Sequence, residues 1–71
     1  MSEFKEGDII KYSGGPTALA RLMSPHAGGW HAKQCLGRTI FISIGYPNFY
    51  PVHIATEDEI AEARTSEFWS L

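Results

Sequence analysis

Three histidines and one cysteine are the side chains best suited to chemistry in this 71-residue sequence. His26, His31 and Cys35 fall within ten residues of one another, and His53 follows later. Imidazole and thiolate groups gathered in this way could bind zinc. Structural zinc sites usually present their ligands in closely spaced pairs, however, and Cys35 has no partner cysteine. We therefore expect no metal site and no other cofactor.

The same residues are the only candidates for nucleophilic catalysis. A cysteine nucleophile needs a base within hydrogen-bonding distance. His31 and Cys35 are four residues apart, so on one strand they share a face but lie about 13 Å apart. Cys35 and His53 could meet only across strands, and no third group that would orient the base is evident. We therefore expect the protein not to be an enzyme.

A glycine-rich segment, SGGP at residues 13–16, separates two short apolar runs. A phosphate-binding loop would continue with Lys-Ser/Thr and lead into a helix, whereas this segment leads into a predicted strand. Gly14 and Gly15 permit positive φ and Pro16 restricts φ, so the chain can reverse sharply here. The segment predicts a β-hairpin.

Alternation of apolar and polar residues predicts strands over residues 9–12, 17–23, 30–36, 39–44 and 52–55. In the second strand the alternation predicts Ala18, Ala20 and Leu22 on the core face, opposite Leu19, Arg21 and Met23. In the fourth strand Ile40, Ile42 and Ile44 form one β-branched face. The third strand mixes polar residues on both faces, so we expect it to be partly exposed. Residues 24–29 contain Pro25 and two glycines and predict a loop.

The C-terminal part predicts a short helix. Thr56 and Glu59 match the sequence pattern of a capping box, so a helix is expected to begin after Thr56 and to continue to about Arg64. Phe68 and Trp69 follow in a tail that either folds back onto the sheet or projects from it.

Length and composition indicate one domain spanning residues 1–71. A single cysteine allows no intrachain disulfide, and the first residues are charged and lack the apolar stretch of a signal peptide. We therefore expect a cytoplasmic protein. The net charge is −2, with the acidic residues concentrated at the two ends and the basic residues scattered singly. This balance disfavours general affinity for nucleic acid.

Nine aromatic residues are more than a small barrel buries, and the surplus points to contact with a partner. Residues 45–51 form a predicted loop with two prolines, in which at least one aromatic side chain should be exposed. Trp30 and Arg38 extend the patch. The predicted partner-binding residues are Trp30, Arg38, Tyr46, Phe49 and Tyr50.

A second candidate surface lies on the predicted strands two to four. Its residues are Arg21, Trp30, Lys33, Arg38 and Phe41, and they could form a basic and aromatic face like those of small barrels that bind single strands. The alternative is an ordinary solvated sheet face with scattered charges.

The N-terminal segment FKEGDIIKYSGGPTALARL, together with Gly29-Trp30, resembles the YodC-like family of small bacterial and prophage proteins. The matching residues are Phe4, Lys5, Gly7, Asp8, Ile9, Ile10, Tyr12, Ser13, Gly14, Gly15 and Pro16. The resemblance covers roughly the first half of the chain and implies a small SH3-like β-barrel without catalytic residues. The third strand, the aromatic loop and the capped helix depart from the family pattern.

The sequence therefore predicts an all-β, SH3-like barrel of about five strands with a short C-terminal helix. The expected function is non-enzymatic binding of a protein partner. A phage or prophage origin would make the chain a candidate accessory protein or inhibitor of a host complex. The alternatives are a nucleic-acid-binding barrel and a small-molecule binder that uses the aromatic residues.

Overall fold

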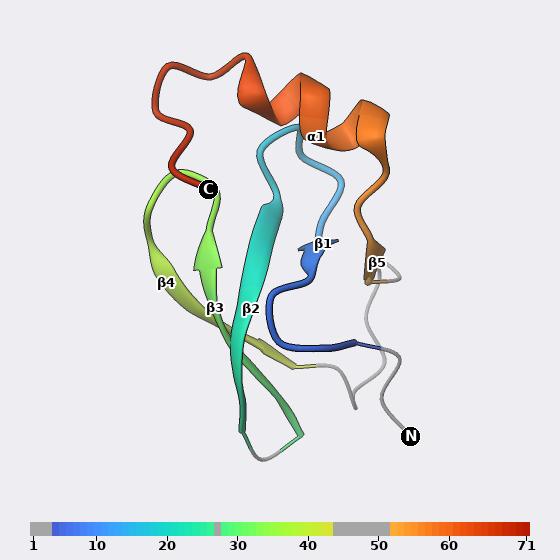
Figure 1. Cartoon of the computed structure of the whole chain (residues 1–71), viewed down its shortest axis with the longest axis vertical. Coiled ribbons are helices and arrows are strands. Elements are labelled where there is room, and N and C mark those ends of the chain that lie inside the picture. Colours follow the sequence, from blue (N-terminus) through green and yellow to red (C-terminus); the bar gives the residue numbers. More distant parts are fainter. Residues whose placement is uncertain (1–3, 27, 44–51) are drawn as a thin grey trace.

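The computed structural model describes residues 4–26, 28–43 and 52–71. Within these ranges five strands and one helix follow one another (Figure 1): β1 (Ile9–Lys11), β2 (Leu19–His26), β3 (Gly29–Gln34), β4 (Thr39–Ser43), β5 (His53–Ile54) and α1 (Glu57–Arg64). The strands pair antiparallel in one sheet, in the order β4-β3-β2-β1-β5. This confirms the predicted five-stranded all-β fold with a short C-terminal helix.

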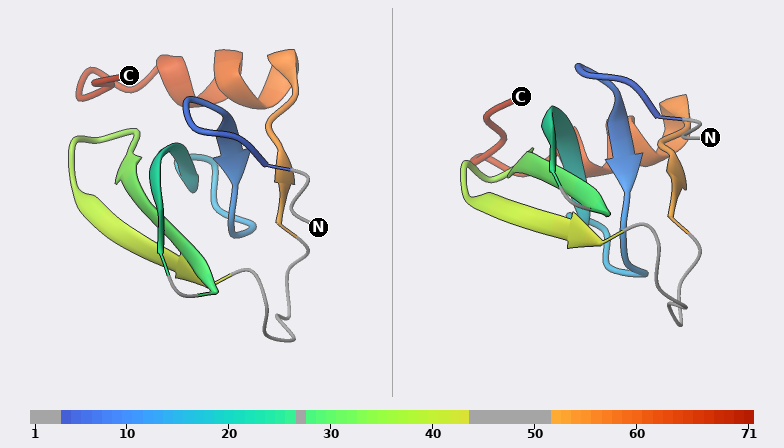
Figure 2. Two further views of the ribbon diagram at one scale, coloured as in Figure 1. Left: turned by 60° about the horizontal axis from the view of Figure 1, so that its bottom comes forward. Right: turned by 90° about the horizontal axis from the view of Figure 1, so that it is seen from below.

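The sheet is curved, because the strands change direction across it in both views of Figure 2. Its edge strands are β4 and β5, and within the described ranges no strand pairing joins these two edges. The described structure is therefore a curved five-stranded sheet. Closure of that sheet into an SH3-like barrel stays a prediction.

The predicted hairpin between β1 and β2 is confirmed. The Tyr12 N–H donates to the Ala18 carbonyl at 3.0 Å, and the Ala18 N–H donates to the Gly15 carbonyl at 3.1 Å. Neither Gly14 nor Gly15 has a positive φ, so the conformational freedom expected at these glycines is not what closes this turn. Gly37, in the turn between β3 and β4, does have a positive φ, of 101°.

Strand β2 continues to His26, through residues predicted to form a loop. The pairing with β3 shifts register between Leu22 and Ser24, so Met23 forms a bulge. Pro25, which lacks an N–H, still pairs with Trp30. The pairing along β1 reaches no further than Leu22, where Asp8 accepts from the Leu22 N–H. Among the described residues, β3 is therefore the one strand beside Pro25, and the missing donor is tolerated.

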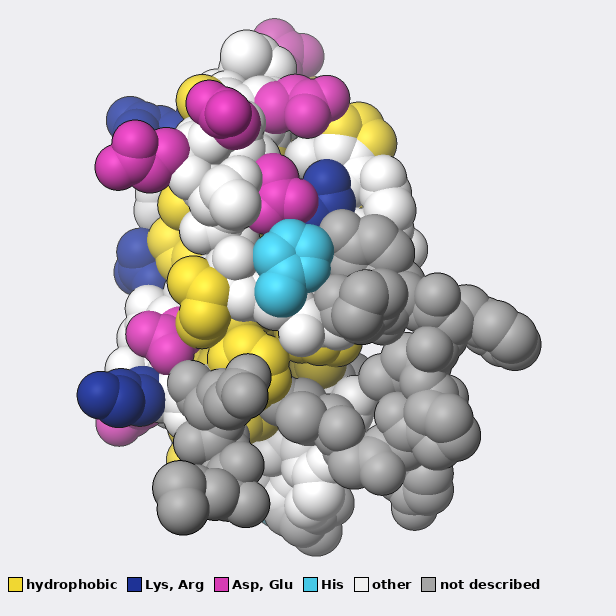
Figure 3. Space-filling model, turned by 90° about the vertical axis from the view of Figure 1, so that its right-hand side faces the viewer, with side chains coloured by type: hydrophobic (Ala, Val, Ile, Leu, Met, Phe, Trp, Pro, Cys, Tyr) yellow, Lys and Arg dark blue, Asp and Glu magenta, His cyan; other side chains and the backbone are white. Residues whose placement is uncertain are grey.

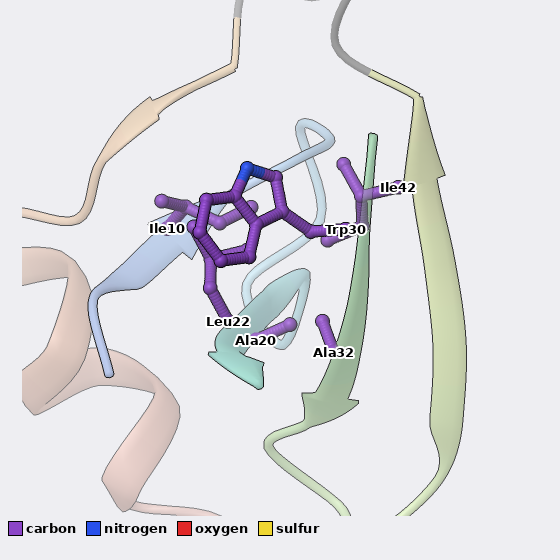
Figure 4. Packing of buried hydrophobic residues seen from close by; sticks show 6 residues of the cluster. All are labelled: Ile10, Ala20, Leu22, Trp30, Ala32 and Ile42. Atoms are coloured by element: carbon purple, nitrogen blue, oxygen red, sulfur yellow. The ribbon is translucent and has the colours of Figure 1, made fainter. Parts of the chain in front are cut away.

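The inner core lies on one face of the sheet (Figure 4). It consists of Ile10, Ala20, Leu22, Trp30, Ala32 and Ile42, with Phe4, Tyr12, Ile40 and Val52 packed against it. The predicted core face of β2 is confirmed, and so is the inward position of Ile42. Ile44 lies outside the described residues.

Strand β3 is less exposed than predicted, because Trp30 is a core residue with only 8 % of its surface accessible. Trp30, Ala32 and Gln34 alternate inward, while His31 is exposed and Lys33 is half-buried. Figure 4 shows the indole ring extending from β3 toward Ile10 and Leu22. The small residues Ala20 and Ala32 leave room for the ring, which the polar composition of β3 concealed.

A second apolar cluster, the outer core, lies on the opposite face of the sheet. Leu19, Cys35, Ala55 and Ala63 are buried there, with Ile9, Leu36, Ile60, Trp69 and Leu71 packed against them. Leu19 was expected on the non-core face, and it does lie opposite the inner core. It is nevertheless fully buried, because α1 and the C-terminal tail cover this end of the outer face. In the tail, Trp69 packs inward and Phe68 is 68 % exposed.

Helix α1 begins at the predicted capping box. The Thr56 hydroxyl accepts from the Glu59 N–H at 3.2 Å, and the Glu59 carboxylate accepts from the Thr56 N–H at 2.9 Å. Acidic residues fill the first turn and Arg64 lies in the last, as the helix dipole favours.

Candidate binding surface

The exposed part of the outer face is formed by β2, β3 and β4, beyond the region that α1 covers. The strand register sets Arg21 opposite Lys33, and Lys33 opposite Thr39. Further from α1, His31 lies opposite Phe41. Side chains opposite one another on one face lie about 5 Å apart at Cβ, so these residues form one continuous surface.

Three rings meet at the far end of this surface. The centroids of His26 and His31 are 4.8 Å apart, and those of His31 and Phe41 are 5.6 Å apart. His26 and Phe41 close the triangle at 5.9 Å, with their planes nearly perpendicular. We call His26, His31 and Phe41 the ring cluster. Phe41 is 46 % exposed, so its ring is available to a partner.

Gly29 makes the position of the Phe41 ring possible. A Cβ atom on Gly29 would lie 2.8 Å from Phe41 Cζ and would also clash with the Ile42 carbonyl oxygen. Because glycine carries no Cβ, β4 and its exposed ring approach the β2–β3 hairpin closely. The ring cluster is therefore part of the packing of this hairpin against β4.

The strands that carry the ring cluster contain basic and no acidic residues, although the whole chain carries −2. Residues 9–56 contain no Asp or Glu, and they contain Lys11, Arg21, Lys33 and Arg38. Lys11 is paired with Glu59, whereas Arg21, Lys33 and Arg38 form no ion pair with any described residue. We call the ring cluster together with Arg21 and Lys33 the open face.

Two of the five predicted partner-binding residues lie among the described residues. Trp30 was expected on the contact surface, and this expectation of exposure is wrong because its indole fills the inner core. Arg38 is exposed in the turn that follows β3. Tyr46, Phe49 and Tyr50 lie outside the described residues.

Sequence reasoning missed the two histidines as members of an aromatic surface. The turn between β3 and β4 spans Gln34 to Arg38, because the Gln34 N–H donates to the Arg38 carbonyl. This turn sets residues 31 and 41 opposite each other and residues 33 and 39 in the next outward row, whereas a two-residue turn at Gly37-Arg38 would set residue 34 opposite residue 41. Met23 at the bulge brings His26 into the same area, and the sequence carried no sign of that bulge.

Cys35 lies beneath the covered part of the outer face and does not belong to the open face. Its side chain is fully buried in the outer core, and its Sγ donates to the Thr17 carbonyl at 3.1 Å. The Gln34 amide also approaches the sulfur, at 3.7 Å. His31, by contrast, is exposed and belongs to the ring cluster. In the described part of the chain, no three His, Cys, Asp or Glu side chains are grouped so as to hold a metal ion.

A separate polar cluster joins β1, β5 and α1. The Glu59 carboxylate lies 3.7 Å from Lys11 Nζ and 3.1 Å from His53 Nε2. The pKa of Glu59 is lowered, chiefly because the Thr56 N–H donates to its carboxylate, and the hydrogen bond with His53 adds to this effect. Figure 3, which faces the side carrying β5, shows a histidine against an acidic side chain with a basic side chain behind it. We assign this cluster to holding α1 on the sheet.

Comparison with family models, curated proteins and solved structures finds no match to this chain. The resemblance to YodC-like proteins therefore stays a prediction. The described residues include no helix with the length and the apolar character that crossing a membrane requires.

Proposed function

We propose that this protein is a non-enzymatic binding module whose contact surface is the open face. The observation that carries the proposal is the exposed ring cluster beside Arg21 and Lys33, two basic side chains without an ion-pair partner among the described residues. Exposed aromatic side chains and arginine are typical anchors of binding surfaces. The absence of Asp and Glu from residues 9–56 favours an anionic partner.

The surroundings of Cys35 support the non-enzymatic part of the proposal. A reactive thiol needs access to its substrate and a neighbouring base. The Cys35 thiol is buried and hydrogen-bonded to a backbone carbonyl. A cytoplasmic location also belongs to the proposal, because a single buried thiol suits a reducing compartment.

A paired set of variants tests this function. Phe41→Ala combined with Arg21→Ala removes one ring and one charge from the open face. Phe68→Ala combined with Arg64→Ala removes the same groups from the helix and tail, away from the open face. Each variant is used as bait in a lysate of the native host, after circular dichroism has confirmed its fold. We expect the open-face pair to lose the captured protein or nucleic acid and the control pair to keep it.

Equal capture by both variants would contradict the assignment of the open face. In that case the predicted contact residues of segment 45–51 are the next to test, with Tyr46→Ala combined with Phe49→Ala.

A further inference from the structure

The open face combines two kinds of groups that single-stranded nucleic acid requires. Phe41 and His31 stand opposite each other on β4 and β3 and offer rings at the surface. Arg21 and Lys33 stand opposite each other on β2 and β3. Lys33 and His31 are two residues apart on β3, so the basic row and the ring row are separated by about 7 Å. One strand could therefore contact both rows at once.

We propose that the open face binds single-stranded nucleic acid, with bases stacked on Phe41 and His31 and phosphates held by Arg21 and Lys33. The proposal rests on the proposed function and names its partner. Stacking on aromatic side chains accepts any base, and positively charged groups follow the backbone, so we expect little sequence preference.

The charge of the open face favours nucleic acid as the partner over an apolar protein surface. Protein interfaces are depleted of Lys and rely on a buried apolar centre. The described residues of β2 to β4 expose two large apolar side chains, Phe41 and Met23, beside two histidines, Arg21 and Lys33. Every acidic residue of the chain lies in residues 1–8 or 57–71. The strands of the open face thus present positive charge without a compensating carboxylate of their own, which suits a polyanion.

Exposed rings also favour a single strand over a duplex. In a duplex the base faces are covered by their neighbours, whereas unpaired bases can be splayed out and stacked on side chains. The open face spans three strands, a width of about 10 Å. This width suits a site at the short end of the range of about 4–16 nucleotides that small barrels cover.

Fluorescence anisotropy with labelled oligonucleotides tests the proposal. The probes are oligothymidylate and oligouridylate strands of about 16 nucleotides and a mixed-sequence duplex of the same length. For the purified 71-residue chain at low salt, we expect binding to both single strands and weaker binding to the duplex. Each phosphate contact should contribute about −0.7 to the slope of log K against log salt concentration, so two contacts predict a slope of about −1.4.

Two matched pairs of variants locate the site. Phe41→Leu should weaken single-strand binding about 5- to 150-fold, the effect of losing one stacked base. Phe68→Leu changes the same residue type in the exposed tail and should leave binding unchanged. Arg21→Gln should reduce the salt slope by about 0.7. Arg64→Gln, which removes the same charge from α1, should not alter the slope.

Three results would overturn the proposal. One is the absence of single-strand binding at low salt, and another is equally tight binding of the duplex. The third is an equal loss in the Phe68→Leu and Phe41→Leu variants. If single strands do not bind but the lysate experiment still yields a protein whose capture needs Phe41 and Arg21, the proposed function stands and only this partner is rejected.

Discussion

The two ends of the outer face of the sheet are built from the same strands but differ in what lies over them. At one end Leu19 and Cys35 are buried beneath α1 and the C-terminal tail. Two residues along the same strands, Arg21 is exposed and Lys33 is half-buried, and beyond them lies the ring cluster. The side chains change from apolar to basic and aromatic at the place where α1 ceases to cover the sheet.

This difference separates residues that hold the fold together from residues that are free to make contacts. The covered end gains stability from removing apolar surface from water. The open end keeps Phe41 at 46 % exposure beside charges that form no ion pair with the residues described by the structure, an arrangement that contributes little to stability. We therefore expect variants at the covered end to change the free energy of unfolding, and variants at the open end to change binding.

The largest effect on stability is expected for Leu19→Ala at the covered end. Leu19 is fully buried, so its truncation leaves a cavity and should cost about 2–5 kcal/mol of unfolding free energy. Met23→Ala, which shortens an exposed side chain of the same strand, should change the free energy by less than about 1 kcal/mol. Urea denaturation measures both. Equal costs would mean that the outer core does not stabilise the fold more than the exposed surface does.

A smaller loss of unfolding free energy is expected from weakening the N-terminal cap of α1, the helix that covers this end of the sheet. Thr56→Ala removes the hydroxyl that accepts from the Glu59 N–H and should cost about 0.5–2 kcal/mol. Amide exchange in residues 57–64 should become faster, while the NMR signals of the His26 and His31 rings stay in place. Thr56→Ser keeps the hydroxyl and serves as the control. Unchanged exchange in the Thr56→Ala variant would refute a stabilising role for the capping box.

The third prediction concerns the polar cluster that attaches α1 to the sheet. The pKa of Glu59 in the folded protein lies below its ordinary value of 4.5, so the ionised carboxylate favours the folded state above pH 4.5. This contribution is lost as the pH falls from 4.5 through the folded-state pKa. Glu59→Gln should therefore flatten the decline of the urea midpoint in this acid range. Glu62→Gln, on the same helix but outside the cluster, should not. Identical pH profiles for the two variants would contradict a lowered pKa of Glu59.

The smallest effect on stability is expected at the open end. Arg21→Gln removes a charge that has no ion pair within the described ranges, so its unfolding free energy should stay within about 0.5 kcal/mol of the parent value. Urea denaturation checks this, and the same variant is used for the salt slope of binding. A loss above about 1 kcal/mol would place Arg21 among the residues that hold the fold together.

Much of the fold follows from local patterns in the sequence. Alternation predicted the inward positions of Ala20, Leu22 and Ile42, and the capping box predicted the start of α1. These signals are local, because a strand's alternation and a helix cap depend on residues a few positions apart. The reversal at residues 13–16 was predicted for the same reason, although the glycines there do not use positive φ.

The tertiary structure alone decided which outward residues are covered and which are open. Leu19 and Arg21 point to the same face of β2. Leu19 is buried because α1 and Trp69 pack over its end of that face, whereas Arg21 lies beyond them and is exposed. Trp30 lies in the core, where Ala20 on β2 and Ala32 on β3 leave room for its ring. The ring cluster depends on the bulge at Met23 and on the register of β3 with β4. In each case, contacts between residues distant in sequence set the outcome, and such contacts leave no periodic signal along the chain.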